Sequence, residues 1–215
     1  MLKETFFNLA ADKRDRIIDI AIQEFADNPY DVASISNIVR EAEITKGTFY
    51  QYFEDKQDLY KYLIELGIEE KLNLLKDLPA GDLSGNLFDY VRRLFQSAVQ
   101  FEVNEPGLAR VAYRAFVEEV PFPKMAEEMR RRGPTQLFKQ LLTQGIHHGE
   151  ISPWADVNLA AFIMETTFYQ FGRYAIKRLK LDDPNVDPDQ IFEDPEAQAL
   201  LDNLIRVFEK GIAYK

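Results

Sequence analysis

The chain has 215 residues, of which 46% are hydrophobic and 29% charged, and its formal net charge is −10 at pH 7. This is the composition of a folded globular protein rather than a disordered or fibrous one, and the length suffices for one or two domains. The absence of cysteine excludes disulfides, thiolate nucleophiles and thiolate metal sites, and it agrees with a reducing compartment.

Charged residues interrupt every long apolar stretch. The N-terminus carries Lys3, Glu4 and Asp12, so it has no apolar secretory core of about 7 to 15 residues. The longest apolar helix candidate contains Glu165 and Arg173, and uncharged runs stay well short of the about 18 residues of a membrane span. We therefore expect a soluble, cytoplasmic protein.

The first strong helical pattern covers about residues 12–25, and the Pro29-Tyr30 pair marks its exit. We expect this helix to be scaffold. Its basic residues, within 13–16, are interpreted as a solvated surface, with contact to a nucleic-acid backbone as the alternative. The apolar residues at helical spacing are Ile17, Ile18, Ala21, Ile22 and Phe25.

Residues 34–56 encode two short helices that meet at a tight corner. Ser34 and Thr45 can each cap a helix by accepting an amide hydrogen bond. Phe49 and Phe53, four residues apart, turn inward on the second helix and leave its polar side chains outside. This is the layout of a helix-turn-helix DNA reader, although any pair of short packed helices would show a similar pattern.

The residues of this second helix carry a family resemblance. The string from Thr45 to Phe53, followed by Asp55-Lys56 and Leu59, closely resembles the signature of the TetR family of bacterial repressors. The resemblance covers about the first 60 residues. Upstream it includes Arg16, Ile17, Ile18, Ala21, Phe25, Tyr30, Ser34 and Ile38.

The resemblance implies an all-α protein with two domains. Residues 1–55 would form a three-helix helix-turn-helix DNA-binding domain. Residues 56–215 would form a larger helical bundle for ligand binding and dimerisation. Carried over by position, the DNA-binding residues are Ser34, Ser36, Thr45, Lys46, Gly47, Thr48, Tyr50, Gln51, Tyr52 and Lys56.

The chemistry of these residues suits that assignment. Lys46 can donate to guanine, Thr48 can meet a base edge or a thymine methyl, and Gly47 lets the helix backbone approach the bases. Tyrosine hydroxyls and Lys56 suit phosphate oxygens, which position the helix without reading sequence.

Two features depart from the expected pattern. Glu43 stands at the corner where the family usually has glycine, and a left-handed conformation there would cost about 1 kcal/mol. Residues 1–60 carry seven Lys and Arg against twelve Asp and Glu, whereas nucleic-acid binders usually present a basic patch. We therefore expect DNA binding to depend on a few local cations and to show a weak salt dependence.

After Lys56 the chain shows long helical patterns separated by Pro and Gly, which favours a helical bundle. Its aromatic residues are mostly core candidates, but inducer pockets use the same residue types with a few polar groups, and Glu165 would favour a cationic ligand. The candidate pocket residues are Phe95, Tyr113, Phe116, Phe138, Phe162, Glu165, Thr166 and Tyr169.

The last two helical segments, about 156–180 and 196–212, are candidates for a four-helix interface between two copies. The alternative is that their apolar stripes face the core of a single chain. A dimer would present two reading heads about 34 Å apart to a palindrome. The candidate interface residues are Leu200, Leu201, Leu204, Ile205, Phe208 and Ile212.

Other chemistry finds little support. The acidic segment 181–195 lacks the spacing of a calcium loop, His147 and His148 point about 100° apart on a helix, and no Gly-rich phosphate loop is present. We predict no metal, cofactor or enzymatic activity. The predicted function is a homodimeric repressor that binds a palindromic operator and is released by a small hydrophobic or amphipathic ligand; the alternative is a DNA-independent helical adaptor or ligand-binding protein.

Overall fold

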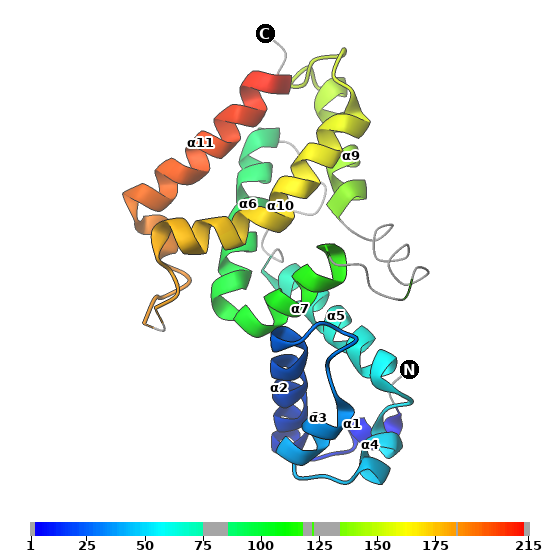
Figure 1. Cartoon of the computed structure of the whole chain (residues 1–215). Helices are drawn as coiled ribbons and strands as arrows, with labels where there is room; N and C mark the ends of the chain where they lie inside the picture. Colours follow the sequence, from blue (N-terminus) through cyan, green and yellow to red (C-terminus); the bar gives the residue numbers. More distant parts are fainter. Residues whose placement is uncertain (1–2, 75–85, 118–121, 123–133, 184, 213–215) are drawn as a thin grey trace. The chain divides into compact units, whose positions relative to one another are not determined.

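The structure is a computed structural model, and it describes residues 3–74, 86–117, 122, 134–183 and 185–212. These residues form helices and connecting loops and contain no strand, which confirms the predicted all-α class (Figure 1). The elements in chain order are α1 (Glu4–Phe7), α2 (Ala11–Asp27), α3 (Ile35–Glu41), α4 (Lys46–Tyr52), α5 (Lys56–Asn73), α6 (Leu87–Asn104), α7 (Pro106–Val117), α9 (Pro134–His147), α10 (Val157–Leu179), the 3₁₀ turn η1 (Ile191–Glu193) and α11 (Pro195–Ile212). No helix among the described residues has the length and apolar character needed to cross a membrane.

The chain divides into two compact units. The first contains Met1–Glu70 and Glu105–Pro121, and the second contains Lys71–Asn104 and Phe122–Lys215. This division differs from the boundary expected after residue 55. Most of α5 belongs to the first unit, where Tyr60 packs against Phe25 with ring centroids 4.9 Å apart. The helix α7 joins the same unit because it packs on α2.

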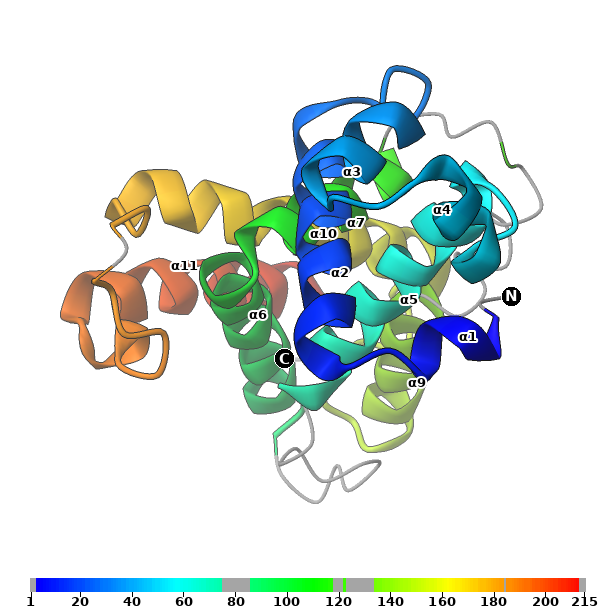
Figure 2. The same ribbon diagram turned by 90° about the horizontal axis from the view of Figure 1, so that it is seen from below.

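The first unit is built around α2, which packs against α3, while α3 in turn packs against α4 (Figures 1 and 2). Phe49 and Phe53 are fully buried and lie 5.0 Å apart between ring centroids, so the two inward positions predicted on α4 are confirmed. The short helix α1 was not predicted. Its Phe6 is fully buried and packs 4.9 Å from Phe53.

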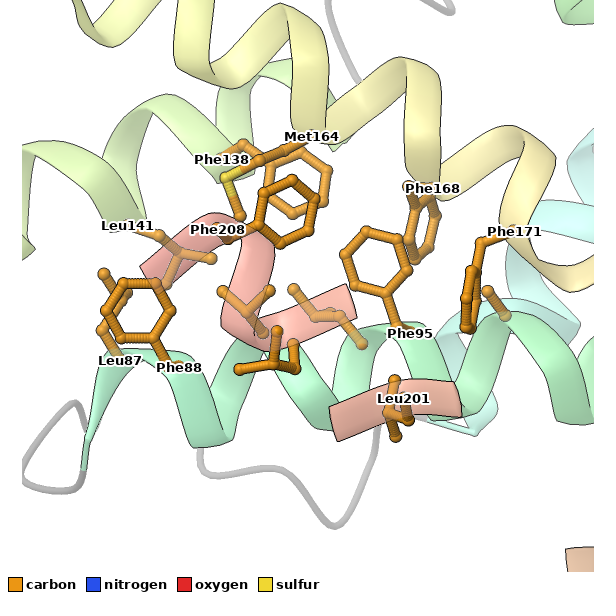
Figure 3. Close-up of a cluster of buried hydrophobic side chains, with 14 of the residues drawn as sticks. Leu87, Phe88, Phe95, Phe138, Leu141, Met164, Phe168, Phe171, Leu201 and Phe208 are labelled. Carbon is orange, nitrogen blue, oxygen red and sulfur yellow. The ribbon is translucent and has the colours of Figure 1, made fainter. Parts of the chain in front are cut away.

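The second unit encloses an aromatic core between α6, α9, α10 and α11 (Figure 3). Phe95 of α6 lies at its centre, because its ring centroid is within 5.7 Å of the rings of Phe168, Phe171 and Phe208. Gly172 of α10 lies directly against the backbone of α6. A Cβ atom at that position would lie 2.7 Å from the carbonyl oxygen of Ala98, so only glycine permits this separation.

The contact at Gly172 gives a testable prediction for stability. We expect Gly172→Ala to lower the free energy of unfolding by about 1–3 kcal/mol, because the added methyl group must push α10 away from the α6 backbone. Urea denaturation monitored by circular dichroism would measure the change. The matched control is Gly211→Ala on α11, where an added Cβ meets no atom within 4 Å and stability should stay the same or rise. Equal effects of the two substitutions would contradict the prediction.

Candidate nucleic-acid interface

The two short helices of the first unit begin at side-chain caps. The Ser34 hydroxyl accepts a hydrogen bond from the backbone N–H of Ser36 at 3.2 Å, and the Thr45 hydroxyl accepts one from the N–H of Thr48 at 3.0 Å. Both predicted caps are therefore confirmed. The Thr45 hydroxyl also lies 2.8 Å from the Thr48 hydroxyl, so it is engaged with its own helix.

The outer face of α4 carries the side chains that could reach DNA. Lys46, Gly47, Tyr50 and Gln51 are exposed, and Thr48 is half-buried. A Cβ atom at Gly47 would have the Thr45 hydroxyl as its nearest neighbour, at an ordinary 3.6 Å, so the fold itself does not require glycine there. Glycine at residue 47 leaves the backbone of α4 uncovered on this exposed face.

Neighbouring parts of the first unit complete the accessible surface. Ser36, in the first turn of α3, is exposed and is available beside the α4 face. Among the described residues, the Lys46 ammonium forms no ion pair, whereas Arg40 pairs with Glu41 at 3.0 Å and Arg14 with Asp15 at 3.6 Å. Within the described part of the chain, Lys46 is therefore an exposed cation without a carboxylate partner.

The corner between α3 and α4 adopts the expected left-handed conformation. Glu43 has φ 57°, although it is not glycine. Arg16 of α2 reaches this corner and binds the Glu43 carboxylate at 3.0 Å and the Glu41 carbonyl oxygen at 3.2 Å. An exposed ion pair of this kind contributes at most about 1 kcal/mol, which is comparable to the strain of the left-handed residue. Arg16 therefore helps to hold the corner and is not merely a solvated cation.

Two residues that are predicted to contact phosphates also have partners within the protein. Tyr52 is only 6% exposed, and its ring packs 5.9 Å from that of Phe6. Lys56 donates hydrogen bonds to the carbonyl oxygens of Tyr30 at 2.7 Å and Ala33 at 2.9 Å. Its ammonium also lies 4.5 Å from the centre of the Tyr30 ring. Lys56 thus secures the loop before α3.

The N-terminal segment holds the far end of α4, a role that the sequence analysis missed. The Lys3 ammonium donates to the carbonyl oxygen of Tyr50 at 2.7 Å, the Lys3 N–H donates to Tyr52 at 3.1 Å, and the Thr5 hydroxyl donates to Gln51. Three successive carbonyl groups in the last turn of α4 therefore have partners. A signal was present, because α4 ends without a capping glycine and its last carbonyl groups need donors from elsewhere.

Comparison with known proteins identifies this arrangement. The sequence model for bacterial regulatory proteins of the tetR family matches residues 17–63, and the model for the tetracyclin repressor-like C-terminal domain matches residues 85–213. The chain belongs to the TetR family. As a member of that family it is a transcriptional regulator, with a DNA-binding N-terminal helix-turn-helix and a helical C-terminal domain.

Individual TetR-family relatives agree with this assignment. A TetR family transcriptional regulator from Chloroflexus aurantiacus J-10-FL is 38% identical over the full length of both chains, with a TM-score of 0.82. The fatty acid metabolism regulator protein of Bacillus subtilis is 28% identical over 151 residues, which are 67% of this chain and 74% of the relative. The structure of FadR from Bacillus subtilis in complex with stearoyl-CoA covers 92% of this chain and 98% of its own, with 20% identity and a TM-score of 0.68; this likeness shows the shared fold.

The eight candidate pocket residues divide between the two units. Phe95 and Phe138 lie in the core of the second unit, while Tyr113 and Phe116 lie on α7 in the first. Phe162 is 59% exposed on the outside of α10. Thr166 is exposed one turn later, and Glu165 and Tyr169 are half-buried. The helical phase of α10 thus turns Phe162 and Thr166 toward solvent.

The candidate interface residues of α11 also separate into two groups. Leu201, Ile205 and Phe208 are buried in the core of their own unit, so for them the intramolecular alternative is correct. Leu200 and Leu204 are half-buried and line a surface groove of about 550 Å³ between α10 and α11. Ile212 is half-buried and packs against the same core.

The groove adjoins a set of apolar side chains on the outer faces of the same two helices. These side chains are 47–67% exposed, which is unusual for large apolar residues when so many occur on two adjacent helices. They are Leu159, Phe162, Ile163 and Tyr174 of α10 and Val207 of α11. We call this set the α10–α11 outer face.

The hydrogen bonds from Lys56 to the loop before α3 give a second prediction. We expect Lys56→Met to lower the free energy of unfolding by about 1–3 kcal/mol, because the substitution leaves the Tyr30 and Ala33 carbonyl groups without their charged donor. Thermal unfolding would measure the loss. Lys46→Met, which removes a cation with no partner among the described residues, is the matched control and should leave the unfolding temperature unchanged. A phosphate-anchor role alone would predict no loss for either variant.

Proposed function

We propose that this TetR-family regulator is a homodimeric repressor that covers a palindromic operator and leaves it when a small hydrophobic or amphipathic effector binds. The observation that carries the proposal is the exposed face of α4, which presents Lys46, Thr48, Tyr50 and Gln51 around a glycine that the fold does not need.

The residues of this face suit different parts of the DNA. Lys46 can donate to the O6 and N7 atoms of guanine, and Thr48 can contact a base edge. Gly47 allows the α4 backbone to approach the floor of the major groove. The hydroxyl groups of Tyr50 and Ser36 suit phosphate oxygens, which orient the helix. In this proposal Tyr52 and Lys56 stabilise the helix-turn-helix: Tyr52 packs in its core, and Lys56 binds the loop before α3.

A second copy of the chain is the proposed partner of the α10–α11 outer face. A twofold axis lets the same surface serve both copies, so an apolar face with a groove can pair with itself. Four helices, α10 and α11 from each copy, would then share the apolar side chains that a single chain leaves in water. Dimerisation also supplies the second reading head that a palindrome needs.

Release by an effector requires a difference in affinity between two conformations of the dimer. An effector that binds the DNA-incompetent conformation about tenfold more tightly shifts the equilibrium by about 1.4 kcal/mol. The stearoyl-CoA bound to FadR from Bacillus subtilis supports an effector with a long apolar chain.

The operator proposal predicts selective recognition of a palindrome. Purified protein incubated with random duplex DNA should enrich a palindromic site. On that site, Lys46→Ala should weaken binding by about 5- to 150-fold, since a good side-chain pair with a base contributes about 1–3 kcal/mol. Gly47→Ala should also weaken binding while leaving protein stability unchanged. Gel-shift titration measures each affinity.

The control is Lys177→Ala, which removes an exposed cation on α10, in the second unit. This variant should bind the operator as the wild-type protein does. Failure to enrich any sequence, or equal binding by all variants, would overturn the operator proposal and leave a DNA-independent helical protein.

The dimer proposal predicts a shift in oligomeric state. Phe162→Asp should convert the dimer to a monomer, because a carboxylate in the middle of the α10–α11 outer face would be desolvated without a partner. Sedimentation velocity measures the result. Asn158→Asp places the same charge on α10 at an exposed polar position and should leave the dimer intact. A wild-type monomer at micromolar concentration would contradict the proposal.

A further inference from the structure

Lys71, near the end of α5, places its ammonium group among aromatic rings of the second unit. The Nζ atom lies 4.2 Å from the centre of the Phe168 ring, 5.5 Å from Phe101 and 6.0 Å from Tyr169. Phe101 and Phe168 are only 3% and 5% exposed, so the rings belong to the interior. Neither the periodicity nor the family signature drew attention to this lysine.

The surroundings of this ammonium do not satisfy its hydrogen-bonding capacity. Burial lowers the pKa of Lys71 to about 8, and the Glu102 carboxylate opposes that change, so the amine is still mostly protonated at pH 7. A protonated lysine has three N–H donors. Among the described residues, no oxygen lies within hydrogen-bonding distance of the Lys71 Nζ. The rings attract the charge but accept no conventional hydrogen bond.

We propose that Lys71 binds the anionic end of an amphipathic effector, whose apolar chain packs beside Phe168 and Phe101. The inference rests on the proposed function and deepens it by naming the effector class: an oxygen anion, such as a carboxylate or phosphate, on an apolar chain. Such an oxygen would accept charge-assisted hydrogen bonds from the ammonium, which the aromatic rings cannot do.

Lys71 changes the ligand that Glu165 alone suggested, because its ammonium already occupies the position among the rings that a cationic ligand would take. An aromatic cage attracts cations, but Lys71 already places a positive charge there, and a second cation would be repelled. Two carboxylates act on the cage: Glu102 acts on Lys71, and Glu165 raises the pKa of Tyr169 in addition to the effect of burial. An incoming anion would therefore compete with Glu102 for the Lys71 ammonium, and removal of that carboxylate should strengthen anion binding.

Lys71 lies on the helix that also contacts the helix-turn-helix, so effector binding at Lys71 could affect DNA binding through α5. Lys71 belongs to α5, and the first residue of α5 is Lys56, which holds the loop before α3. An effector that binds Lys71 thus contacts the same helix that supports the reading unit.

Isothermal titration of the 215-residue protein with four ligands of one chain length tests the inference. The ligands are dodecanoate, dodecanoyl-CoA, dodecanamide and dodecyltrimethylammonium, each used below its micelle concentration. We expect at least one anion to bind about tenfold or more tightly than the neutral amide and the cation. Preference for dodecanoate would identify a carboxylate as the partner of Lys71, and preference for dodecanoyl-CoA alone would identify the phosphate-bearing thioester.

Three variants separate a binding role from a packing role. Lys71→Met should reduce anion binding about tenfold, to the level of the amide, while amide binding stays unchanged. Lys71→Arg should retain the preference for anions, and Glu102→Gln should strengthen it. Circular dichroism confirms that each variant is folded.

Several results would overturn the inference: no binding of any ligand, equal binding of anion and amide, tighter binding of the cation, or equal anion binding by wild type and Lys71→Met. The operator experiment has a separate outcome. Intact operator recognition together with any of these results would reject the role of Lys71 and leave the repressor proposal standing.

Discussion

The helix that we propose to contact DNA is too short to be stable alone, and the first unit is organised around that constraint. Seven residues, Lys46–Tyr52, form α4, whereas isolated helices need about 12–15 residues even to be marginal in water. The stability of α4 must therefore come from contacts with the rest of the first unit. Thr45 caps its start, Phe49 anchors its inner face in the core, and the segment around Lys3 binds the carbonyl groups at its end.

The acidic charge of the chain is compatible with DNA binding because charges act locally. Surface charges separated by more than about 8–10 Å are largely screened at physiological ionic strength. Several cations of the first unit are already neutralised by adjacent carboxylates, as in the pairs Arg40–Glu41 and Arg16–Glu43. Lys46 has no such partner among the described residues, and it lies on the exposed face. We therefore expect affinity for DNA to depend on a small number of residues rather than on a broad basic surface.

In the second unit, the helix α11 carries apolar side chains on two faces, and only one of these faces is covered within the chain. On α11, Leu201, Ile205 and Phe208 pack into the core, while Val207 remains in contact with water. An apolar period identifies a face of a helix but does not identify what covers it. The aromatic residues behave in the same way: Phe95 and Phe138 fill the core, and Phe168 also lies beside the Lys71 ammonium.

The sequence alone determined the features that depend on residues within a few positions of one another. It predicted the all-α class, the caps Ser34 and Thr45, the inward positions Phe49 and Phe53, the left-handed corner at Glu43 and the TetR family. Each of these follows from one helical turn, one tight turn or one contiguous motif, and such signals are short-range in the chain.

The tertiary structure alone decided which distant residues meet. Lys56 contacts carbonyl groups 23 and 26 residues before it, and the Lys3 side chain contacts one 47 residues after it. Such pairings are set by how the helices pack, so the sequence did not predict the Lys56 hydrogen bonds or the helix α1. The contacts of Lys71 could not be predicted for the same reason. The rings that surround its ammonium come from α6 and α10, and no sequence pattern relates those residues to α5.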